Sequence, residues 1–211
     1  MIDIVAVDGW RDLGRFLRVP WVVCGDDPQW VPPLLLERRL HCSRFNPVFE
    51  HARWQGFIAL RDGRPVGRIS AQVDTLHRAH HGADTGHFGM LDAVDDPDVF
   101  AALFEAAEGW LAAEGARRIT GPFSFSINQE CGLLVAGFDT PPVLMMPHGR
   151  PWYEARIREI GHEGVEDLLA YWVETDFVPP KVMQGLLRRY RDRLVVRPMR
   201  RDRLADELVI L

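Results

Sequence analysis

Two side chains with the chemistry to act on a substrate, Asn128 and Glu130, lie two positions apart in the segment 121–153. Glu130 is followed by an apolar run that extends to Phe138. An apolar surrounding raises the pKa of a carboxyl group, and a carboxylate with a raised pKa can serve as a general base. The neighbouring amide of Asn128 could orient a carbonyl group or the carboxylate itself.

The same two residues also have a structural interpretation. Ser126 followed three positions later by Gln129 fits a capping box. In that case Asn128 and Glu130 would help to start a helix that runs through Leu134. The residue types alone leave both interpretations open.

The segment 121–153 is itself unusual. It passes from a polar run to an apolar one and then through Pro141-Pro142 and two adjacent methionines. A long irregular connection within a compact domain is usually either functional or disordered. Its many apolar residues and low net charge argue against disorder, so the segment is predicted to carry a site. Met145 and Met146 suit either core filling or an irregular apolar ligand such as an acyl chain.

Other reactive residues give weaker indications. Asp92, near the end of an expected strand at 86–94, is a second candidate base. Cys131 has no histidine at a spacing typical of a nucleophile, and an isolated cysteine is more often a small buried hydrophobe. His77, His80 and His81 lie in an expected loop, and His87 lies at the start of the strand expected after it. No nearby carboxylate is arranged to complete a metal site, and we therefore expect no metal.

Composition limits the class of protein. The apolar fraction is 47% and there are seven tryptophans, enough for a substantial core in a chain of 211 residues. No apolar run reaches the length of a membrane span, and the N-terminus has no basic leader, so a cytoplasmic protein is expected. Three scattered cysteines make a disulfide framework improbable.

The net charge of −5 conceals a basic block. Nine basic and two acidic residues in 181–203 give this stretch a charge of +7. Such a block suits a solvated helix face, an anionic lipid surface or a phosphorylated cofactor. Nucleic acid is disfavoured, because few aromatic residues accompany the arginines.

The order of elements follows from local patterns. Asp62-Gly63 predicts a tight hairpin between strands at 55–61 and 64–73. Asp95-Asp96-Pro97 predicts the start of a long amphipathic helix that Gly115 ends. Further strands are expected at 2–7, 86–94, 117–121, 168–175 and 195–199, and further helices at 10–17, 34–40, 151–160, 179–194 and 202–211.

Three stretches make the chain resemble a known superfamily. They are RDGRPVGRI, GPFSFSINQECGLLVAGFDTPP and PWYEARIREIGHEGVEDLLAY. Together with the element order they are similar to GCN5-related N-acetyltransferases (GNAT), and specifically to a bacterial subfamily of two related halves that includes the bacterial ceramide synthases. The resemblance covers roughly 21–199 and implies an α/β fold with a mixed, mainly antiparallel sheet flanked by helices.

The resemblance also implies a function and an organisation. The chain would be the N-terminal half of an N-acyltransferase that uses acyl-CoA or acetyl-CoA as co-substrate and a small-molecule or lipid amine as acceptor. A GNAT-like domain is expected at 1–178, with a basic helix and the start of a second GNAT-like domain at 179–211 that continues beyond Leu211. Contact with the inner face of the membrane is expected for a fatty acyl substrate.

Two departures from the superfamily qualify this implication. GNAT enzymes usually bind the CoA pyrophosphate at the start of the long helix, but here Asp95, Asp96 and Asp98 occupy that positive end. We therefore expect no ordinary CoA pyrophosphate site in this half. The tyrosine that serves as general acid in many members would stand at Ile157. Tyr153 lies one turn earlier on the same face, and it is a candidate for the same role if the helix is displaced by about one turn. The alternative function is a catalytically degenerate GNAT-like domain that binds a ligand or partner.

Overall fold

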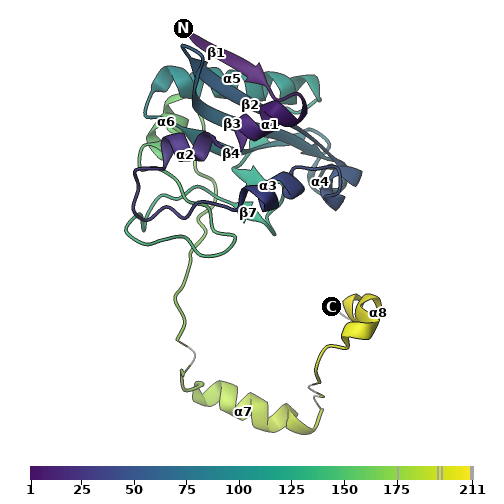
Figure 1. The fold of residues 1–211 in the computed structure, drawn as a ribbon. Helices are drawn as coiled ribbons and strands as arrows, with labels where there is room; N and C mark the ends of the chain where they lie inside the picture. The colour runs from purple at the N-terminus through teal and green to yellow at the C-terminus, as the bar shows by residue number, and fades with distance from the viewer. Residues whose placement is uncertain (175, 194, 196, 210–211) are drawn as a thin grey trace. The chain divides into compact units, whose positions relative to one another are not determined.

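The structure, a computed structural model, describes residues 1–174, 176–193, 195 and 197–209 (Figure 1). The chain forms two compact units, Met1–Leu168 and Leu169–Leu211. All the candidate site residues lie in the first unit, and each unit is described by itself. Within the described ranges, no helix is both long enough and apolar enough to cross a membrane.

The first unit is built around a five-stranded sheet with the spatial order β1-β2-β3-β4-β5 (Figure 1). Neighbours from β1 to β4 are antiparallel, whereas β4 and β5 run parallel. The prediction of a mixed, mainly antiparallel sheet in an α/β fold is therefore confirmed. The strands are β1 (Ile2–Ala6), β2 (Ala52–Arg61), β3 (Arg64–Asp74), β4 (Thr85–Ala93) and β5 (Arg118–Thr120).

The β2–β3 hairpin turns at the residues that predict it. Asp62 and Gly63 have φ angles of 51° and 75°, as a two-residue hairpin turn requires. Alternate residues of β3 then point to opposite faces of the sheet. Gly67 lies against helix α5 (Pro97–Ala113), whereas Arg68 lies against the other layer, beside the main chain of Phe16.

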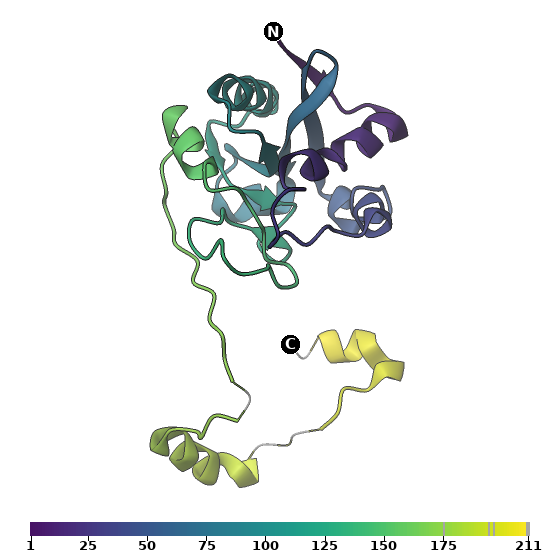
Figure 2. The same ribbon diagram turned by 60° about the vertical axis from the view of Figure 1, so that its left-hand side comes forward.

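Helices cover both faces of the sheet, and Figure 2 shows the sheet between the two helical layers. One layer holds α5 and α6 (Tyr153–Glu159); buried apolar side chains of α5 pack on the sheet. The other layer consists of α1 (Gly9–Phe16), α2 (Val19–Val23), α3 (Leu35–His41) and the short 3₁₀ helix η1 (Pro47–Glu50). Helix α2 was not predicted, because its five residues are too few to show a helical period.

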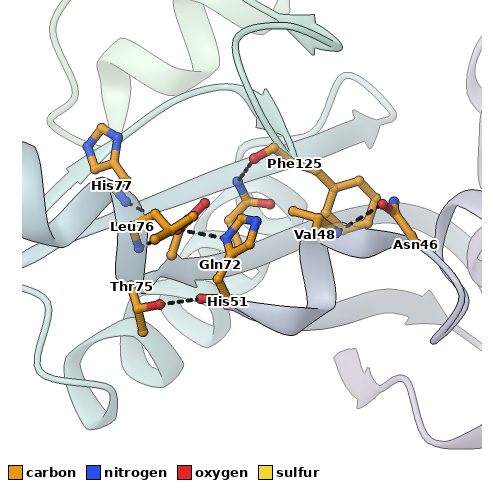
Figure 3. A network of polar contacts seen from close by, with 9 residues as sticks. Asn46, Val48, His51, Gln72, Thr75, Leu76, His77 and Phe125 are labelled. Carbon is orange, nitrogen blue, oxygen red and sulfur yellow. Dashed lines mark hydrogen bonds and ion pairs between the residues drawn. The ribbon is translucent and has the colours of Figure 1, made fainter. Parts of the chain in front are cut away.

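The histidine-rich stretch is a helix, α4 (Thr75–His81), so the prediction of a loop there was wrong. The Asp74 carboxylate accepts hydrogen bonds from the backbone N–H groups of Leu76 and His77, at 2.8 and 3.1 Å. Such side-chain capping supplies partners for the unpaired donors at a helix start. Figure 3 shows these contacts beside His51, which also bonds to the Asp74 carboxylate.

The second unit contains short helical pieces. The basic helix expected at 179–194 is present as α7 (Lys181–Tyr190), followed by the 3₁₀ turn η2 (Arg191–Arg193). Helix α8 (Leu204–Leu208) follows η3 (Arg201–Arg203). The strand expected at 168–175 is not formed in its described residues, 168–174, and 175 lies outside them. The strand expected at 195–199 includes residue 196, also outside the described residues. The predicted domain boundary near 178 stays a prediction.

Candidate functional site

One cavity of about 130 Å³ is lined by residues of α2, α3, β3 and β4 together with segment 121–153. The segment 121–153 forms much of its wall, as its irregular composition predicts. The apolar part of the lining includes Leu17, Trp30, Leu133 and Met146. Ionisable side chains share the same lining, namely Arg38, Arg68, Asp92, Glu130, His148 and Tyr153. Polar and apolar groups thus contribute to the lining in similar measure. Concave sites on which polar groups converge are where small molecules usually bind.

Segment 121–153 is attached to the sheet by specific contacts. The side-chain amide of Gln72 donates a 2.7 Å hydrogen bond to the carbonyl oxygen of Phe125, as Figure 3 shows. The backbone N–H of Met90 donates to the hydroxyl of Ser124 at 3.3 Å. Two short strands, β6 (Phe123–Ser124) and β7 (Glu130–Cys131), pair with each other and present Glu130. The position of Glu130 in the cavity therefore depends on contacts with both β3 and β4.

The first ion pair of the cavity joins Arg68 and Asp92. The Arg68 Nε donates to the Asp92 Oδ2 at 2.7 Å, and the two side chains expose only 13% and 10% of their surface. Burial raises the pKa of the Asp92 carboxyl above its usual value, and the charge and hydrogen bond of Arg68 act in the opposite direction. The guanidinium also donates to the Phe16 carbonyl at 3.2 Å.

The second ion pair joins Arg38 of α3 to Glu130 of β7. Each of these side chains is 23% exposed, so this pair is more accessible than the first. Gln129, the neighbour of Glu130, accepts a 2.7 Å hydrogen bond at its Oε1 from the Nε2 of His41, also on α3. Helix α3 thus fixes the β7 end of the segment from two sides.

Tyr153, the first residue of α6, lines the cavity with a side chain that is almost completely buried. Its hydroxyl oxygen accepts a 3.1 Å hydrogen bond from the backbone N–H of Ala93. Burial, aided by the negative charge of Asp92, raises the pKa of Tyr153 well above its ordinary value. The side chain therefore keeps its proton at neutral pH and can donate it in a hydrogen bond.

Asn128 lies apart from these residues. It is exposed in a turn, where its backbone N–H donates to the Ser126 hydroxyl at 3.3 Å, and it is not part of the cavity lining. The helix proposed to run through Leu134 is not formed, because Glu130 enters β7 instead. The capping-box interpretation was therefore wrong.

The sequence did not single out His148 and Asp27, which form a third polar pair at the cavity. The His148 Nε2 lies 3.0 Å from the Asp27 Oδ2, and 121 positions separate the two residues. Arg150 bonds the same carboxylate at 3.2 Å. A single histidine in the 121–153 segment gives no spacing signal, so only the folded chain brings it to its partner.

The other candidates have structural surroundings. His77 stacks on His81 at 4.5 Å and contacts His87 at 4.6 Å between ring centroids. Burial lowers the pKa of His87 to about 4, with a further contribution from His77. Among the residues that the structure describes, no group of three or more His, Cys, Asp or Glu side chains is arranged to hold a metal ion. The Cys131 thiol contacts the Ile127 carbonyl at 3.7 Å.

The start of α5 is occupied by the chain's own charges. Asp96 caps the helix by accepting from the N–H of Asp98 at 2.9 Å, and it also pairs with Arg61 at 2.5 Å. Asp95 pairs with Arg156 of α6 at 2.8 Å. Both carboxylates thus have partners, and the expectation that a CoA pyrophosphate does not bind here stays a prediction.

No family model matches the chain, but two curated bacterial proteins match almost all of it. The chain is 52% identical over 203 residues to Protein YghO of Escherichia coli (strain K12), covering 95% of this chain and 52% of that protein. It is 41% identical over 213 residues to the bacterial ceramide synthase of Caulobacter vibrioides (strain NA1000 / CB15N), covering 100% of this chain and 56% of that protein. The chain spans about half the length of these relatives.

Solved structures share the fold at low sequence identity. A tandem GNAT protein from the clavulanic acid biosynthesis pathway superposes with a TM-score of 0.51 at 16% identity, covering 76% of this chain and 43% of that one. AAC(6')-Iy in complex with a CoA-containing bisubstrate analogue superposes with a TM-score of 0.50 at 14% identity. The match covers 82% of this chain and 99% of that one. The chain therefore has the GNAT fold and is homologous to a bacterial ceramide synthase. The predicted fold and resemblance are confirmed, and together they support acyl transfer in general.

Proposed function

We propose that this chain is the acceptor-binding part of an N-acyltransferase, which moves an acyl group from a CoA thioester to an amine held in the cavity. The observation that carries this proposal is the convergence of two Arg–carboxylate pairs and Tyr153 on one cavity with both polar and apolar walls, in a GNAT fold. An amine acceptor brings a positive charge and an organic body, and these two features match the carboxylates and the apolar lining. The homology with a ceramide synthase supports a long-chain acyl group and a lipid amine.

Each predicted site residue has a place in this proposal. Glu130 is the more exposed carboxylate, and its two oxygens can accept from the acceptor's ammonium group as well as from Arg38. Tyr153 keeps its phenolic proton and can donate a hydrogen bond to a polar group of the substrate. Asn128, exposed in its turn, would contact the acceptor only at the mouth of the cavity.

The donor is proposed to be acyl-CoA or acetyl-CoA. AAC(6')-Iy, which shares the fold, was crystallised with a bisubstrate analogue that contains CoA. At the start of α5 the backbone N–H of Asp98 already donates to the Asp96 carboxylate, so this donor is not free for the phosphates of the donor substrate. We propose that these phosphates bind to a second GNAT-like domain of the full-length protein.

Acyl transfer can be tested directly with the full-length protein. Palmitoyl-CoA or acetyl-CoA is mixed with sphinganine or hexylamine, and release of free CoA thiol is followed together with the amide product by mass spectrometry. Amide formation that requires the protein supports the proposal. Absence of amide from every pair, with protein shown to be folded, would reject it.

The role of Glu130 gives a sharper prediction. Replacing Glu130 with glutamine removes a charged partner of the ammonium group, and such a hydrogen bond contributes about 1.5–3 kcal/mol. The KM for the amine should therefore rise about 10- to 100-fold, while the KM for acyl-CoA stays unchanged. Glu105→Gln, on the exposed surface of α5, is the matched control and should have no effect. An unchanged amine KM in Glu130→Gln would remove Glu130 from the site.

The rival function is a degenerate GNAT-like domain that binds a ligand without catalysis. The start of α5, whose carboxylates are already paired, favours it. Thermal unfolding separates the two functions, because a ligand that binds only the folded state raises the apparent stability. An amine that raises the melting temperature without any amide being formed with either CoA thioester would favour the rival.

The basic helix α7 suggests where the reaction takes place. Lys181, Arg188 and Arg189 are exposed on it together with Val182 and Leu187. A basic helix with exposed apolar side chains suits an anionic lipid surface. We propose that the protein works in the cytoplasm at the inner face of the membrane. Sedimentation with phosphatidylglycerol vesicles, but not with phosphatidylcholine vesicles, is the expected result, and Arg188→Glu/Arg189→Glu should abolish it.

A further inference from the structure

A second hollow, an open groove of about 340 Å³, is lined by Arg18, by Trp21 of α2 and by Leu35 of α3. Trp21 is 36% exposed, so a ligand can reach its ring. The one charged group of the lining, the Arg18 guanidinium, already donates to the Gly14 carbonyl at 3.0 Å. The groove therefore offers a ligand mainly apolar surface.

The groove adjoins the cavity along two helices. Adjacent residues of α2 are divided between the two hollows, because Pro20 lines the cavity and Trp21 lines the groove. On α3, Leu35 lines the groove and Arg38 lines the cavity. These two positions are about 4.5 Å apart along the helix axis, since each residue rises about 1.5 Å.

The chain that leads into α3 also passes from one hollow to the other. Trp30, Val31 and Pro33 line the cavity, and Val31 is 56% exposed at its edge. Leu35, two residues beyond Pro33, lines the groove. The rings of Trp30 and Trp21 meet edge to face, with their centroids 5.2 Å apart. The boundary between cavity and groove is therefore built from aromatic and aliphatic side chains.

The sizes of the two hollows indicate what a shared ligand looks like. The cavity, at about 130 Å³, is smaller than the roughly 300–1,000 Å³ of a site that encloses a drug-sized molecule. It can hold a polar head at Glu130, and any longer part of the ligand must leave it. An apolar groove beside a charged cavity matches a molecule with an ionic head and a hydrocarbon tail. Each methylene group buried there would raise affinity about fourfold.

We propose that this groove, the tail groove, holds the hydrocarbon tail of the acceptor whose ammonium group lies at Glu130. The inference deepens the proposed acyl transfer and rests on it. The acceptor is then an amine with one chain, long enough to cross the boundary at Val31 and Pro33. The tail groove is assigned to the acceptor and not to the acyl chain of the donor, because it adjoins the α3 turn that bears Arg38, the partner of Glu130.

The kinetic test compares a long and a short acceptor with the full-length protein and palmitoyl-CoA. Trp21→Ala removes the aromatic wall of the tail groove and should raise the KM for sphinganine about 10-fold. The KM for hexylamine should change much less, and the KM for palmitoyl-CoA should stay unchanged. Hexylamine turnover also shows whether the variant is folded. Trp21→Phe keeps an apolar ring and should recover most of the affinity for sphinganine.

Trp10→Ala is the matched control, because it removes a tryptophan that lines neither hollow. Trp10 lies on α1 and is 76% exposed. The KM for sphinganine should equal that of the wild type. An equal rise in Trp10→Ala and Trp21→Ala would overturn the tail groove, because the effect would then not depend on the groove.

Photolabelling locates the tail without relying on activity. Dodecylamine with a diazirine at the far end of its chain is irradiated with the full-length wild type, and the labelled peptides are identified by mass spectrometry. Labels are expected at residues 18–22 and at Leu35, and excess sphinganine should suppress them. Labels confined to Leu133 and Pro142 of the cavity would overturn the assignment. Suppression by palmitoyl-CoA alone would give the groove to the acyl chain, and labels that neither compound suppresses would show only non-specific apolar contact; both results reject the proposal.

The outcomes separate the tail groove from the proposed function. If the wild type acylates both amines and Trp21→Ala changes neither KM, the tail groove is wrong and acyl transfer stands. If no amide forms from any pair, but sphinganine still suppresses labelling at Trp21, the proposed function fails. The tail groove then stands as the binding site of a long-chain amine that the protein does not acylate.

Discussion

Replacing Arg68 with methionine is expected to lower the free energy of unfolding by about 3–5 kcal/mol at pH 7, because it leaves a buried charge without its partner. Arg68 and Asp92 are both largely buried, and Arg68 is the main group that favours the charged form of the Asp92 carboxyl. Methionine retains much of the apolar packing of the arginine stem. The loss of stability therefore comes mainly from the missing positive charge beside Asp92. Urea unfolding followed by tryptophan fluorescence measures it.

The loss of unfolding free energy caused by Arg68→Met should become smaller as the pH is lowered. Burial already raises the folded-state pKa of Asp92 above its ordinary value of 3.8, and removal of Arg68 raises it further. A carboxyl whose pKa is higher in the folded state binds protons more tightly there, so the free energy of unfolding falls as the pH rises from the unfolded pKa to the folded pKa. The difference in free energy of unfolding between Arg68→Met and the wild type is therefore greatest at pH values above the pKa of Asp92 in the folded variant. It is smallest below pH 3.8, where the carboxyl is protonated in both states.

Two controls isolate the buried pair. The double variant Arg68→Met/Asp92→Asn lacks both charges and should recover a large part of the lost stability. Arg38→Met breaks the more exposed pair with Glu130, where each side chain is 23% exposed, and should cost less. If Arg68→Met lost no more stability than Arg38→Met at pH 7, the cavity would be far more hydrated than the burial of Asp92 indicates.

The second large effect is expected from Gly89→Ala in β4. A Cβ at this position would overlap the carbonyl oxygen of Phe123, and a backbone atom cannot rotate away as a side chain can. The strand and the segment 121–124 would have to separate, so we expect a loss of about 3 kcal/mol or more in unfolding free energy. Acyl transfer should fall as well, because this segment leads directly to Glu130.

Gly109→Ala in α5 is the matched control for Gly89→Ala. No atom lies within 4 Å of its added Cβ, and alanine favours a helix interior over glycine by about 0.5–1 kcal/mol. This variant should therefore be as stable as the wild type or slightly more stable. Equal melting temperatures for the two alanine variants would contradict the close contact between β4 and the segment.

Local patterns in the sequence were sufficient to predict most of the first unit. The turn at Asp62-Gly63 and the cap at Asp96 use residue types with strong local preferences, and both lie where they were expected. The strand expected at 168–175 fails in its described part, because a strand requires a partner that its own sequence does not specify. The histidine stretch was mistaken for a loop because the cap at Asp74 was not considered.

The candidate site was only partly predictable. The composition of 121–153 indicated where a cavity wall would form, and Glu130 and Tyr153 both line it. Asn128 does not, because it lies exposed in a turn that precedes β7. The Asp27–His148 pair could not be found from sequence, since no regular spacing relates two residues that meet only through the fold.

Three polar contacts at the cavity join residues far apart in the chain, with separations of 92 for Arg38–Glu130, 121 for Asp27–His148 and 60 for Ala93–Tyr153. Contacts between distant residues form slowly, because the entropy of closing long loops must be overcome first. The cavity should therefore be among the last parts of the molecule to form during refolding. Recovery of amine binding would then lag behind recovery of helical circular dichroism, and a chain that stalls before segment 121–153 docks would have secondary structure but no site.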